Sequence, residues 1–220
     1  MSDYIEILEN NNLFKNISRD EIIHMLNCIP NHTSSYKEGE YIFRVGDTVS
    51  NVYVVLKGAV QLEHTDYWGN FNIISVFTKG SMFGESFAFL EGNREVSLSV
   101  KTTEDTVIMA LDSYKILTMC TNACLFHNKL IRNLVSIMSN KNTLLNKKMM
   151  YLSERSIKSK LLAYLSDCQR KEKSSKFSIK YNRQELADFL SVDRSAMSKE
   201  LSKLKKEGIL DYHKNHFELY

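Results

Sequence analysis

Glycine placement is the feature that most constrains how this chain can fold. Seven of its eight glycines fall between Gly39 and Gly92. Short runs rich in β-branched and aromatic residues accompany them: Tyr41–Phe43, Val52–Leu56, Phe71–Phe77 and Thr106–Ala110. Turn residues that recur roughly every ten positions among such runs are typical of short antiparallel strands. The sequence therefore predicts an antiparallel β-roll or β-sandwich from about residue 36 to residue 112.

The segment before this region predicts a short helical lead-in between Leu13 and Ile29. Ser18 is suited to cap the helix, and Glu21 stands three residues later. In this arrangement each side chain can bond the backbone N–H of the other residue. The lead-in and the β-roll together form the expected first domain, residues 1–113.

The pattern changes after Tyr114, because no Gly or Pro occurs up to Leu152 and apolar residues recur at spacings of three and four. One stripe alternates these spacings as the seam of a two-stranded coiled coil does. The seam consists of Ile131, Val135, Met138, Asn142, Leu145, Met149 and Leu152. A second stripe beside it consists of Leu130, Leu134, Ile137 and Leu144.

A helix with two adjacent apolar stripes has two surfaces to bury. We expect the second stripe to pack on the β-roll and the seam to pack on a partner subunit, so residues 114–152 form a dimerisation helix. A long helix buried within a monomer is the alternative. Asn142 favours the dimer, because a lone seam Asn fixes register in a coiled coil but is costly in a monomeric core.

The last third of the chain is basic. Residues 151–220 carry 15 Lys and Arg against 10 Asp and Glu, a balance of +5. The whole-chain totals of 29 and 26 leave 14 and 16 for residues 1–150, a balance of −2. A basic segment on a slightly acidic body suggests an anionic partner there.

This basic third, residues 153–220, has the pattern of a helix-turn-helix. A helix from Ser156 to Cys168 and a short strand, Phe177–Tyr181, lead into it. Asn182 and Glu185 form a capping box for the next helix. Ser191 and Val192 make a tight turn, Asp193 caps a second helix from Arg194 to about Lys205, and the small Ala187 lets the two helices cross closely.

The exposed face of the second helix has the chemistry of a recognition helix. Arg and Lys can donate to guanine in the major groove, and short Ser side chains let the backbone approach the bases. We expect DNA contacts from Arg183, Gln184, Arg194, Ser195, Ser198, Lys199 and Lys206. Ser202 shares this face, and Lys203 and Lys205 are placed near phosphates with Arg183 and Lys206. A solvated basic helix is the alternative to this interpretation. Two β runs follow Gly208, at Ile209–Tyr212 and Phe217–Tyr220, and predict a hairpin wing.

With these motifs assembled, the chain resembles the Crp/Fnr family, that of the cyclic-AMP receptor protein and the fumarate-nitrate reduction regulator. The resemblance runs from about Leu13 to Leu219. It rests on five segments: Lys37–Asp47, Val52–Gly58, Gly80–Glu85, Asn182–Ala187 and Arg194–Leu201. It implies a cyclic-nucleotide-binding-type β-roll, a long dimerisation helix and a winged helix-turn-helix, an α+β fold.

The resemblance also assigns an effector pocket to Gly84, Glu85, Ser86, Arg94 and Glu95. Family members that bind cyclic AMP follow Gly-Glu with Arg-Ser or Arg-Thr, which holds the cyclic phosphate. The same spacing in this chain reaches Glu95 and Val96, and Arg94 stands one position early. A shift of one residue in a strand turns a side chain to the opposite face. We therefore predict that cyclic AMP does not bind productively and leave the effector unidentified.

Metal and haem sites receive little support from the sequence. The four cysteines, Cys28, Cys120, Cys124 and Cys168, contain no C-x-x-C pair, so free thiols are expected. Cys120 and Cys124 share a helical face, where two packing residues are favoured over a metal pair. An iron–sulfur cluster is not expected, since only Cys28 lies near the N-terminus. Haem ligation is the alternative to surface or core roles for four histidines: His24, His32, His64 and His127.

Together these observations predict a homodimeric, sequence-specific DNA-binding transcription regulator whose β-roll senses a signal. Double-stranded DNA with a pseudo-palindromic site, RNA polymerase and an unknown small-molecule effector are the expected partners. A cyclic-nucleotide-type module that gates a partner protein without binding DNA is the alternative. No motif of an enzyme is found: no nucleophile elbow, P-loop, H-E-x-x-H or G-x-G-x-x-G after a strand. No apolar run approaches the roughly 20 residues that span a bilayer, and the N-terminal residues Met1–Glu6 lack the basic and apolar regions of a signal peptide, so a cytoplasmic location is expected.

Overall fold

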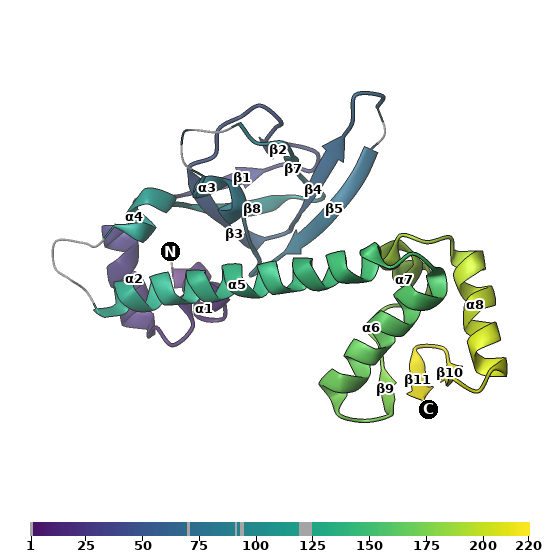
Figure 1. Cartoon of the computed structure of the whole chain (residues 1–220). Helices are drawn as coiled ribbons and strands as arrows, with labels where there is room; N and C mark the ends of the chain where they lie inside the picture. Colours follow the sequence, from purple (N-terminus) through teal and green to yellow (C-terminus); the bar gives the residue numbers. More distant parts are fainter. Residues whose placement is uncertain (1, 70, 91, 93–94, 119–124) are drawn as a thin grey trace. The chain divides into compact units, whose positions relative to one another are not determined.

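The computed structural model describes residues 2–69, 71–90, 92, 95–118 and 125–220 (Figure 1). These residues form two compact units, Met1–Met138 and Ser139–Tyr220. The prediction of antiparallel sheets in the N-terminal part and a helix-turn-helix in the C-terminal part is confirmed. In the described part of the chain, no helix has the length and apolar character needed to cross a membrane.

The first unit begins with α1 (Ser2–Glu9), the 3-10 helix η1 (Asn12–Phe14) and α2 (Arg19–Cys28). The capping box expected at the start of α2 is present. The Glu21 backbone N–H donates to Ser18 Oγ at 3.4 Å, and the Ser18 N–H donates to Glu21 Oε2 at 2.8 Å. Helix α1 was not predicted, because its eight residues repeat the apolar spacing too few times to be distinctive.

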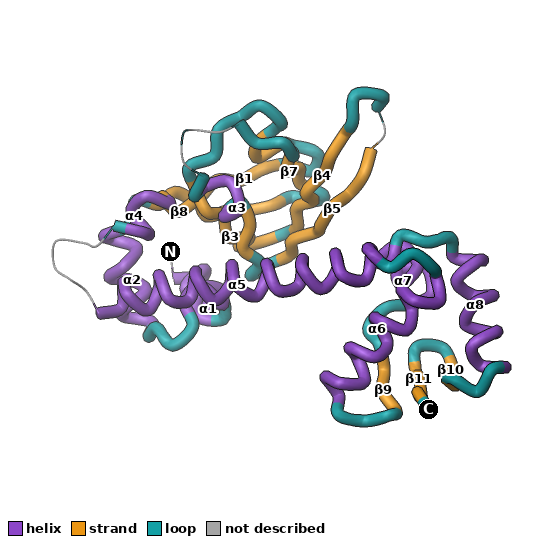
Figure 2. The backbone as a smooth tube through the Cα atoms, viewed as in Figure 1, coloured by secondary structure: helices purple, strands orange, loops and turns teal. Residues whose placement is uncertain are grey.

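Two four-stranded antiparallel sheets form the β-roll (Figure 2). The order in the first sheet is β1 (Asn31–Tyr36), β8 (Thr106–Asp112), β3 (Asn51–Lys57) and β6 (Met82–Phe83). The order in the second sheet is β2 (Tyr41–Phe43), β7 (Ser99–Thr102), β4 (Ala59–Thr65) and β5 (Phe71–Thr78). The four predicted runs lie within β2, β3, β5 and β8. Strand β1 starts earlier than the expected position 36, because its polar sequence lacks an apolar alternation.

A hydrophobic core lies between these sheets. Phe43 and Val100 contribute from the second sheet, and Phe83 and Ile108 contribute from the first. Alternate residues of a strand point to opposite faces, so each strand supplies this core from one face only. Two short helices adjoin the roll, α3 (Glu85–Ala88) after β6 and α4 (Ser113–Leu117) after β8.

The long helix α5 (Leu125–Ser153) contributes to both units. In its first half, Leu130 and Leu134 are buried in a core shared with α1, α2 and the first sheet, and this half runs beside α1 and α2 (Figure 1). Asn133 Nδ2 donates to the carbonyl of Leu13 at 2.9 Å. Three members of the second stripe thus pack as expected, since Ile137 is partly buried there. The prediction is wrong for Leu144, which is 66 % exposed because it lies beyond the part of α5 that belongs to the first unit.

The second unit continues with α6 (Ile157–Glu172), β9 (Lys176–Ser178), α7 (Arg183–Leu190), α8 (Arg194–Lys206), β10 (Leu210–His213) and β11 (His216–Leu219). The strands form one antiparallel sheet in the order β10, β11, β9. Helix α6 extends to Glu172, beyond the predicted end at Cys168, because the charged residues expected in a loop form a solvated last turn instead. Leu165, Leu186 and Leu201 join the three helices in one core.

The last turns of α5 are joined firmly to this second unit. The Tyr151 side chain is only 4 % exposed, and its ring packs against Tyr164 and Phe189 at centroid distances of 5.7 and 6.1 Å. Its hydroxyl donates to Asp167 Oδ2 at 2.8 Å, and Lys147 Nζ donates to the same oxygen at 2.7 Å. The end of α5 and the start of the helix-turn-helix therefore share one packed junction.

Candidate nucleic-acid interface and sensor site

Helix α7 begins with the capping box that the sequence predicts. Asn182 Oδ1 accepts the backbone N–H groups of Gln184 and Glu185 at 2.9 and 3.0 Å. Glu185 Oε2 accepts the Asn182 N–H at 2.8 Å. Three N–H donors of the first turn are thereby satisfied without a partner from elsewhere, so the start of the helix-turn-helix is fixed locally.

The turn between α7 and α8 uses a left-handed serine. Ser191 has φ 51° and ψ 59°, a conformation that glycine adopts more readily. The Val192 N–H donates to the Ala187 carbonyl at 3.0 Å, which closes the turn. Ala187 is fully buried, as its proposed role at the helix crossing requires. The Ser at this position therefore preserves the tight turn.

Asp193 is the N-cap of helix α8. Asp193 Oδ1 accepts the Ala196 N–H at 2.8 Å and the Ser195 hydroxyl at 2.6 Å. These two hydrogen bonds, the one from Ser195 first, lower the pKa of Asp193 below its ordinary value. The first turn of α8 is thus ordered, and Arg194 stands on it with its side chain exposed.

The exposed cations of α8 fall into two groups. Arg194, Lys199 and Lys206 form no ion pair with any residue that the structure describes. By contrast, Lys205 is paired with Asp211, and Lys203 lies 3.9 Å from Glu207. Three positive side chains on one helix that are not held in ion pairs make a surface that attracts an anion.

The serines complete this face. Ser195 and Ser202 are exposed, and Ser198 is partly exposed. The Ser202 hydroxyl donates to the Ser198 carbonyl at 3.0 Å, so it lies close to the helix backbone. Short side chains held in this way leave room for α8 to approach another surface closely.

Two predicted contact residues on α7 differ in their availability. Gln184 is exposed, and its Nε2 donates to Asp188 Oδ1 at 2.8 Å. Arg183 is partly buried, and its guanidinium carbon lies 4.8 Å from the ring centroid of Tyr212 and 5.1 Å from that of Phe217. The structure therefore places Arg183 on the wing and apart from the free cations of α8. Its spacing in the sequence gave no sign of this contact.

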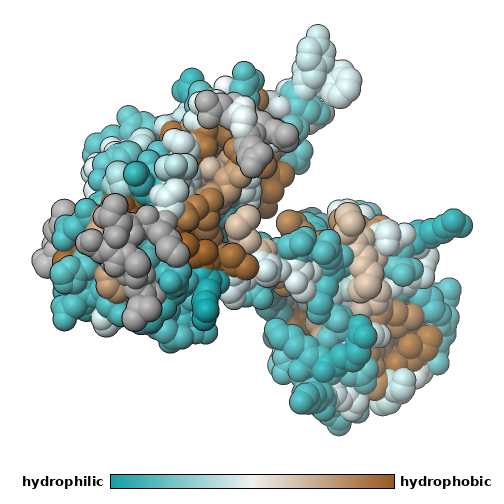
Figure 3. Space-filling view, turned by 60° about the vertical axis from the view of Figure 1, so that its left-hand side comes forward, coloured by the Kyte–Doolittle hydropathy of each residue, from teal (hydrophilic) through white to brown (hydrophobic). Residues whose placement is uncertain are grey.

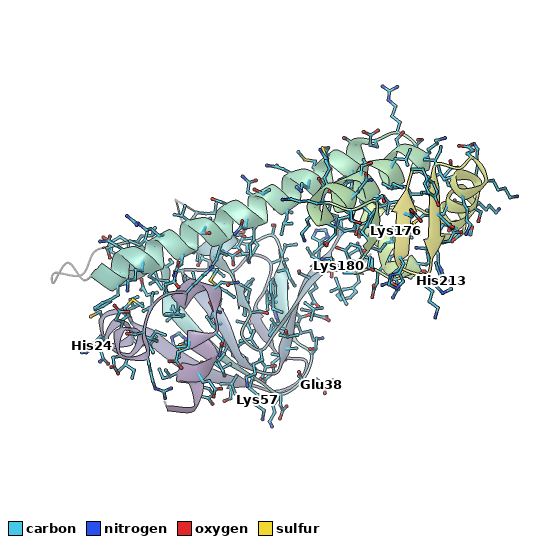
Figure 4. All side chains as sticks on the ribbon, turned by 90° about the horizontal axis from the view of Figure 1, so that it is seen from below. His24, Glu38, Lys57, Lys176, Lys180 and His213 are labelled. Atoms are coloured by element: carbon cyan, nitrogen blue, oxygen red, sulfur yellow. The ribbon has the colours of Figure 1, made fainter. Side chains whose placement is uncertain are left out.

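The wing is the hairpin of β10 and β11. Its turn contains Lys214, whose φ of 53° is left-handed, and His213 and His216 face each other in the register. Figure 4 labels His213 together with Lys176 of β9 and Lys180, which follows β9. All three side chains are exposed, and Lys176 lies 3.4 Å from Glu218 of β11 in an ion pair.

The sensor residues Gly84, Glu85 and Ser86 lie together at the start of α3. Gly84 has φ 84°, and a Cβ there would lie 2.7 Å from Tyr53 Cδ2, so only glycine fits. Glu85 is buried, and the Ser86 hydroxyl donates to its Oε1 at 3.1 Å. These three residues form a compact corner of the β-roll.

Of the two remaining predicted pocket residues, Arg94 and Glu95, the structure describes Glu95. Arg94 lies outside the described residues. Glu95 is exposed, and its backbone forms an isolated antiparallel β-bridge with Thr48. Val96 is only 2 % exposed and belongs to the core between the sheets. Position 95 thus presents a carboxylate to solvent, and position 96 offers no hydroxyl.

Aromatic side chains occupy the space beside this corner. Tyr53 stacks on Phe83 with centroids 5.1 Å apart, and Phe77 stacks on Phe83 at 5.5 Å. Phe43 contacts Tyr53 and Phe87 at 5.9 and 6.0 Å. Burial raises the pKa of Tyr53 above its ordinary value. Aromatic rings therefore fill this part of the roll interior.

The histidines singled out in the sequence differ in their burial. His127 is buried, with its Nε2 2.9 Å from the carbonyl of Ile116, as a satisfied core histidine would be. His24 and His32 are exposed. Among the residues that the structure describes, no three His, Cys, Asp or Glu side chains are grouped to hold a metal. Cys120 and Cys124 lie outside the described residues.

The coiled-coil seam of α5 is exposed along most of its length. Four of its apolar side chains are 40–67 % exposed: Val135, Met138, Leu145 and Met149. Asn142 between them is exposed too, and Ile131 is partly exposed. Hydrophobic patches of this kind interrupt the otherwise polar surface (Figure 3). A row of exposed apolar residues on one helix marks a surface that a partner can cover.

Comparison with known families matches both halves of the chain. Residues 33–123 match the cyclic nucleotide-binding domain family, and residues 159–219 match the Crp-like helix-turn-helix domain family. The second match covers α7, the turn, α8 and the wing. It favours DNA binding over a sensor module without a DNA-binding domain.

Individual relatives match either most of the chain or about half of it. The chain is 26 % identical over 175 residues to the cyclic AMP receptor protein of Thermus thermophilus, covering 80 % of this chain and 77 % of that protein. A match of 24 % over 111 residues to cGMP-dependent protein kinase 2 of Mus musculus covers 50 % of this chain and only 14 % of the kinase.

The fold has a counterpart among solved structures. The catabolite activator protein of Thermus thermophilus superposes with a TM-score of 0.56 at 23 % identity, covering 96 % of this chain and 94 % of that one. The agreement therefore extends over both units. With a cyclic nucleotide-binding domain followed by a Crp-like helix-turn-helix, the chain belongs to the Crp/Fnr family of DNA-binding transcription regulators.

Proposed function

We propose that this regulator reads an inverted-repeat DNA site as a homodimer, with Arg194, Lys199 and Lys206 of α8 facing the DNA. The observation that carries this proposal is that these three exposed cations form no ion pair with any of the described residues. Arg194 and Lys199 are positioned to read base edges with Ser195 and Ser198, and Lys206 is positioned for a phosphate.

The exposed seam of α5 supports the dimer. Burying an apolar side chain of this size contributes about 1.5–3 kcal/mol, and two copies of the seam would bury several such side chains at once. Asn142 would fix the register of the two helices. The twofold symmetry of such a dimer requires a DNA site with the same symmetry, a pseudo-palindrome.

The signal sensed by the β-roll is proposed to be something other than cyclic AMP. The relative from Thermus thermophilus is named a cyclic AMP receptor protein. In this chain, however, Glu95 is an exposed carboxylate and Val96 is buried in the core. An acidic side chain at the position that should hold a phosphate is repulsive.

Partners and location follow from this role. Regulation at a promoter brings the protein to RNA polymerase, a further proposed partner, and to the cytoplasm, where its DNA lies. The protein acts by binding and not as an enzyme. Effects on transcription come from where it sits on DNA and from how the sensor signal alters that binding.

Capture of sheared genomic DNA tests this function. The full chain is incubated with the fragments at physiological salt, and bound fragments are sequenced. A matched variant carries Arg194→Ala, Lys199→Ala and Lys206→Ala, which are all surface changes. We expect discrete enriched fragments with the wild type and their loss with the variant. Enrichment that is absent, or equal for both proteins even after cell extract is added as a source of effector, contradicts the proposal.

A further inference from the structure

Arg183 is a predicted DNA contact whose side chain is partly buried against the wing. It is the first residue of α7, yet its guanidinium lies over the rings of Tyr212 in β10 and Phe217 in β11. Its Nη2 is shielded from solvent and has no hydrogen-bond partner within the described residues. In this geometry the Arg183 side chain contacts the wing.

Tyr212 links this contact to α8. Its hydroxyl lies 3.3 Å from Ser202 Oγ, and Lys205 Nζ lies 5.5 Å from the centroid of its ring. Lys205 also pairs with Asp211, the neighbour of Tyr212 in β10. One ring is therefore held from α7 on one side and from α8 on another, and the wing is anchored to both helices of the helix-turn-helix.

Aromatic rings are packed against one another where Arg183 meets the wing. Phe217 is buried and stacks on Phe177 of β9 with centroids 6.2 Å apart. The centroids of Tyr212 and Phe217 are 5.9 Å apart. Arg183 thus rests on an aromatic platform that all three strands of the sheet support.

We infer that Arg183 is a positioning residue, which sets the wing against the helix-turn-helix through Tyr212 and does not itself contact a DNA phosphate. The inference rests on the proposed DNA-binding function. A planar guanidinium stacks on aromatic faces in a way that the compact ammonium of lysine does not reproduce. Moving the guanidinium to a phosphate would break both ring contacts at once.

The two roles predict different responses to substitution. A phosphate contact is largely maintained by lysine, and its loss lowers the slope of log affinity against log salt by about 0.9. A stacked positioning residue is not replaced by lysine, and its loss leaves that slope unchanged, because no counterion is displaced at this position. Salt dependence therefore separates the two.

The test measures affinity by fluorescence anisotropy over a salt series on a DNA fragment that the wild type enriches. The variants are Arg183→Lys, Arg183→Met, Tyr212→Phe and Tyr212→Leu, with Lys206→Met as the phosphate-contact control. We expect both Arg183 variants to lose roughly tenfold in affinity with an unchanged slope, as loss of a cation–π contact implies. Tyr212→Phe, which keeps the ring, should stay within about threefold of the wild type.

A second measurement needs no DNA. Melting temperatures of Arg183→Met, Tyr212→Leu and the double variant form a cycle, and the proposal expects the double variant to melt no lower than Tyr212→Leu alone. Additive losses of melting temperature in the double variant would overturn the proposal. So would a salt series in which Arg183→Lys binds DNA with wild-type affinity and Arg183→Met lowers the slope of log affinity against log salt. If the wild type binds no DNA, the proposed function fails, while the melting temperatures still test whether Arg183 and Tyr212 stabilise the fold together.

Discussion

Side chains on the DNA-facing helix differ in whether they are already engaged within the protein. Arg194, Lys199 and Lys206 have no ion-pair partner among the described residues, whereas Lys205 is held by Asp211. A cation that is engaged internally must give up that contact before it can bind DNA, so its net contribution to affinity is smaller. The free cations are therefore the ones whose removal should matter most.

Arg194→Ala should weaken binding by about 1–3 kcal/mol per half-site and relax the preference at one base pair, because a base-reading donor is lost. Competition binding against a panel of single-base variants of the site measures both effects. Lys206→Ala serves as the control and should weaken all sequences alike. An unchanged base preference in Arg194→Ala would show that another residue reads the bases.

Cyclic AMP should bind at least a hundredfold more weakly than a site with the phosphate-holding arginine would allow. Loss of a charge-assisted donor costs about 2–3 kcal/mol, each 1.4 kcal/mol or so is tenfold in affinity, and the Glu95 carboxylate adds repulsion. Titration calorimetry on protein that still binds DNA measures this. Micromolar affinity that Arg94→Ala abolishes would contradict the prediction and assign the phosphate to Arg94.

At the scale of helices and strands, local signals were readable from the sequence. The capping boxes of α2 and α7 follow from Ser18 and Asn182, since a cap depends only on residues within one turn. The strands next to glycines were also predicted correctly, because turn residues and β-branched runs are likewise local signals in the sequence. The exposure of Arg194, Ser195 and Lys199 on α8 also follows from helical spacing, because a period of 3.6 residues separates these positions from the buried Met197 and Leu201.

Contacts between distant segments were not readable. The stack of Arg183 on Tyr212 joins α7 to β10 and is not encoded in the spacing of either element. The exposure of Leu144 likewise depends on where the first unit ends along α5. Such features depend on tertiary packing, which periodicity within one element does not report.

The junction of α5 and α6 offers a test at this scale. Asp167 accepts hydrogen bonds from Lys147 and Tyr151 and pairs with Arg170 at 3.1 Å. The hydrogen bond from Lys147 is the largest cause that holds the pKa of Asp167 below its ordinary value. The charged carboxylate therefore stabilises the folded state above about pH 4, and this contribution is lost as the pH falls through the lowered pKa.

Asp167→Asn should lower the free energy of unfolding by about 1–2 kcal/mol at pH 7, since Lys147 is partly exposed and screened. The deficit relative to the wild type should shrink as the pH falls from about 4, where the carboxylate of the unfolded chain becomes protonated, through the lowered pKa of Asp167 in the folded protein. Urea unfolding at pH 7 and at a series of pH values below about 4 measures this difference in the free energy of unfolding. Glu172→Gln, an exposed carboxylate of the same helix, is the control, and a deficit independent of pH would contradict the role of the charge.

At the scale of the whole molecule, the exposed seam of α5 implies a second copy. Met138 is 40 % exposed on this seam, and an aspartate there would place two carboxylates in an apolar interface. Met138→Asp should therefore convert a dimer to a monomer in sedimentation at micromolar concentration. Asn140→Asp, on the opposite side of the helix, should leave the dimer intact. A wild-type monomer, or no effect of Met138→Asp, would contradict the assembly.

Selection of bound sequences from random DNA tests the central claim most directly, because it reports the symmetry of the assembly and its mode of reading together. The account predicts an inverted repeat whose half-site centres lie about 34–36 Å apart, one turn of the duplex, on the same DNA face. Cell extract in a parallel selection supplies the effector. Enrichment of a single half-site, a direct repeat or no sequence at all in both selections would contradict the account.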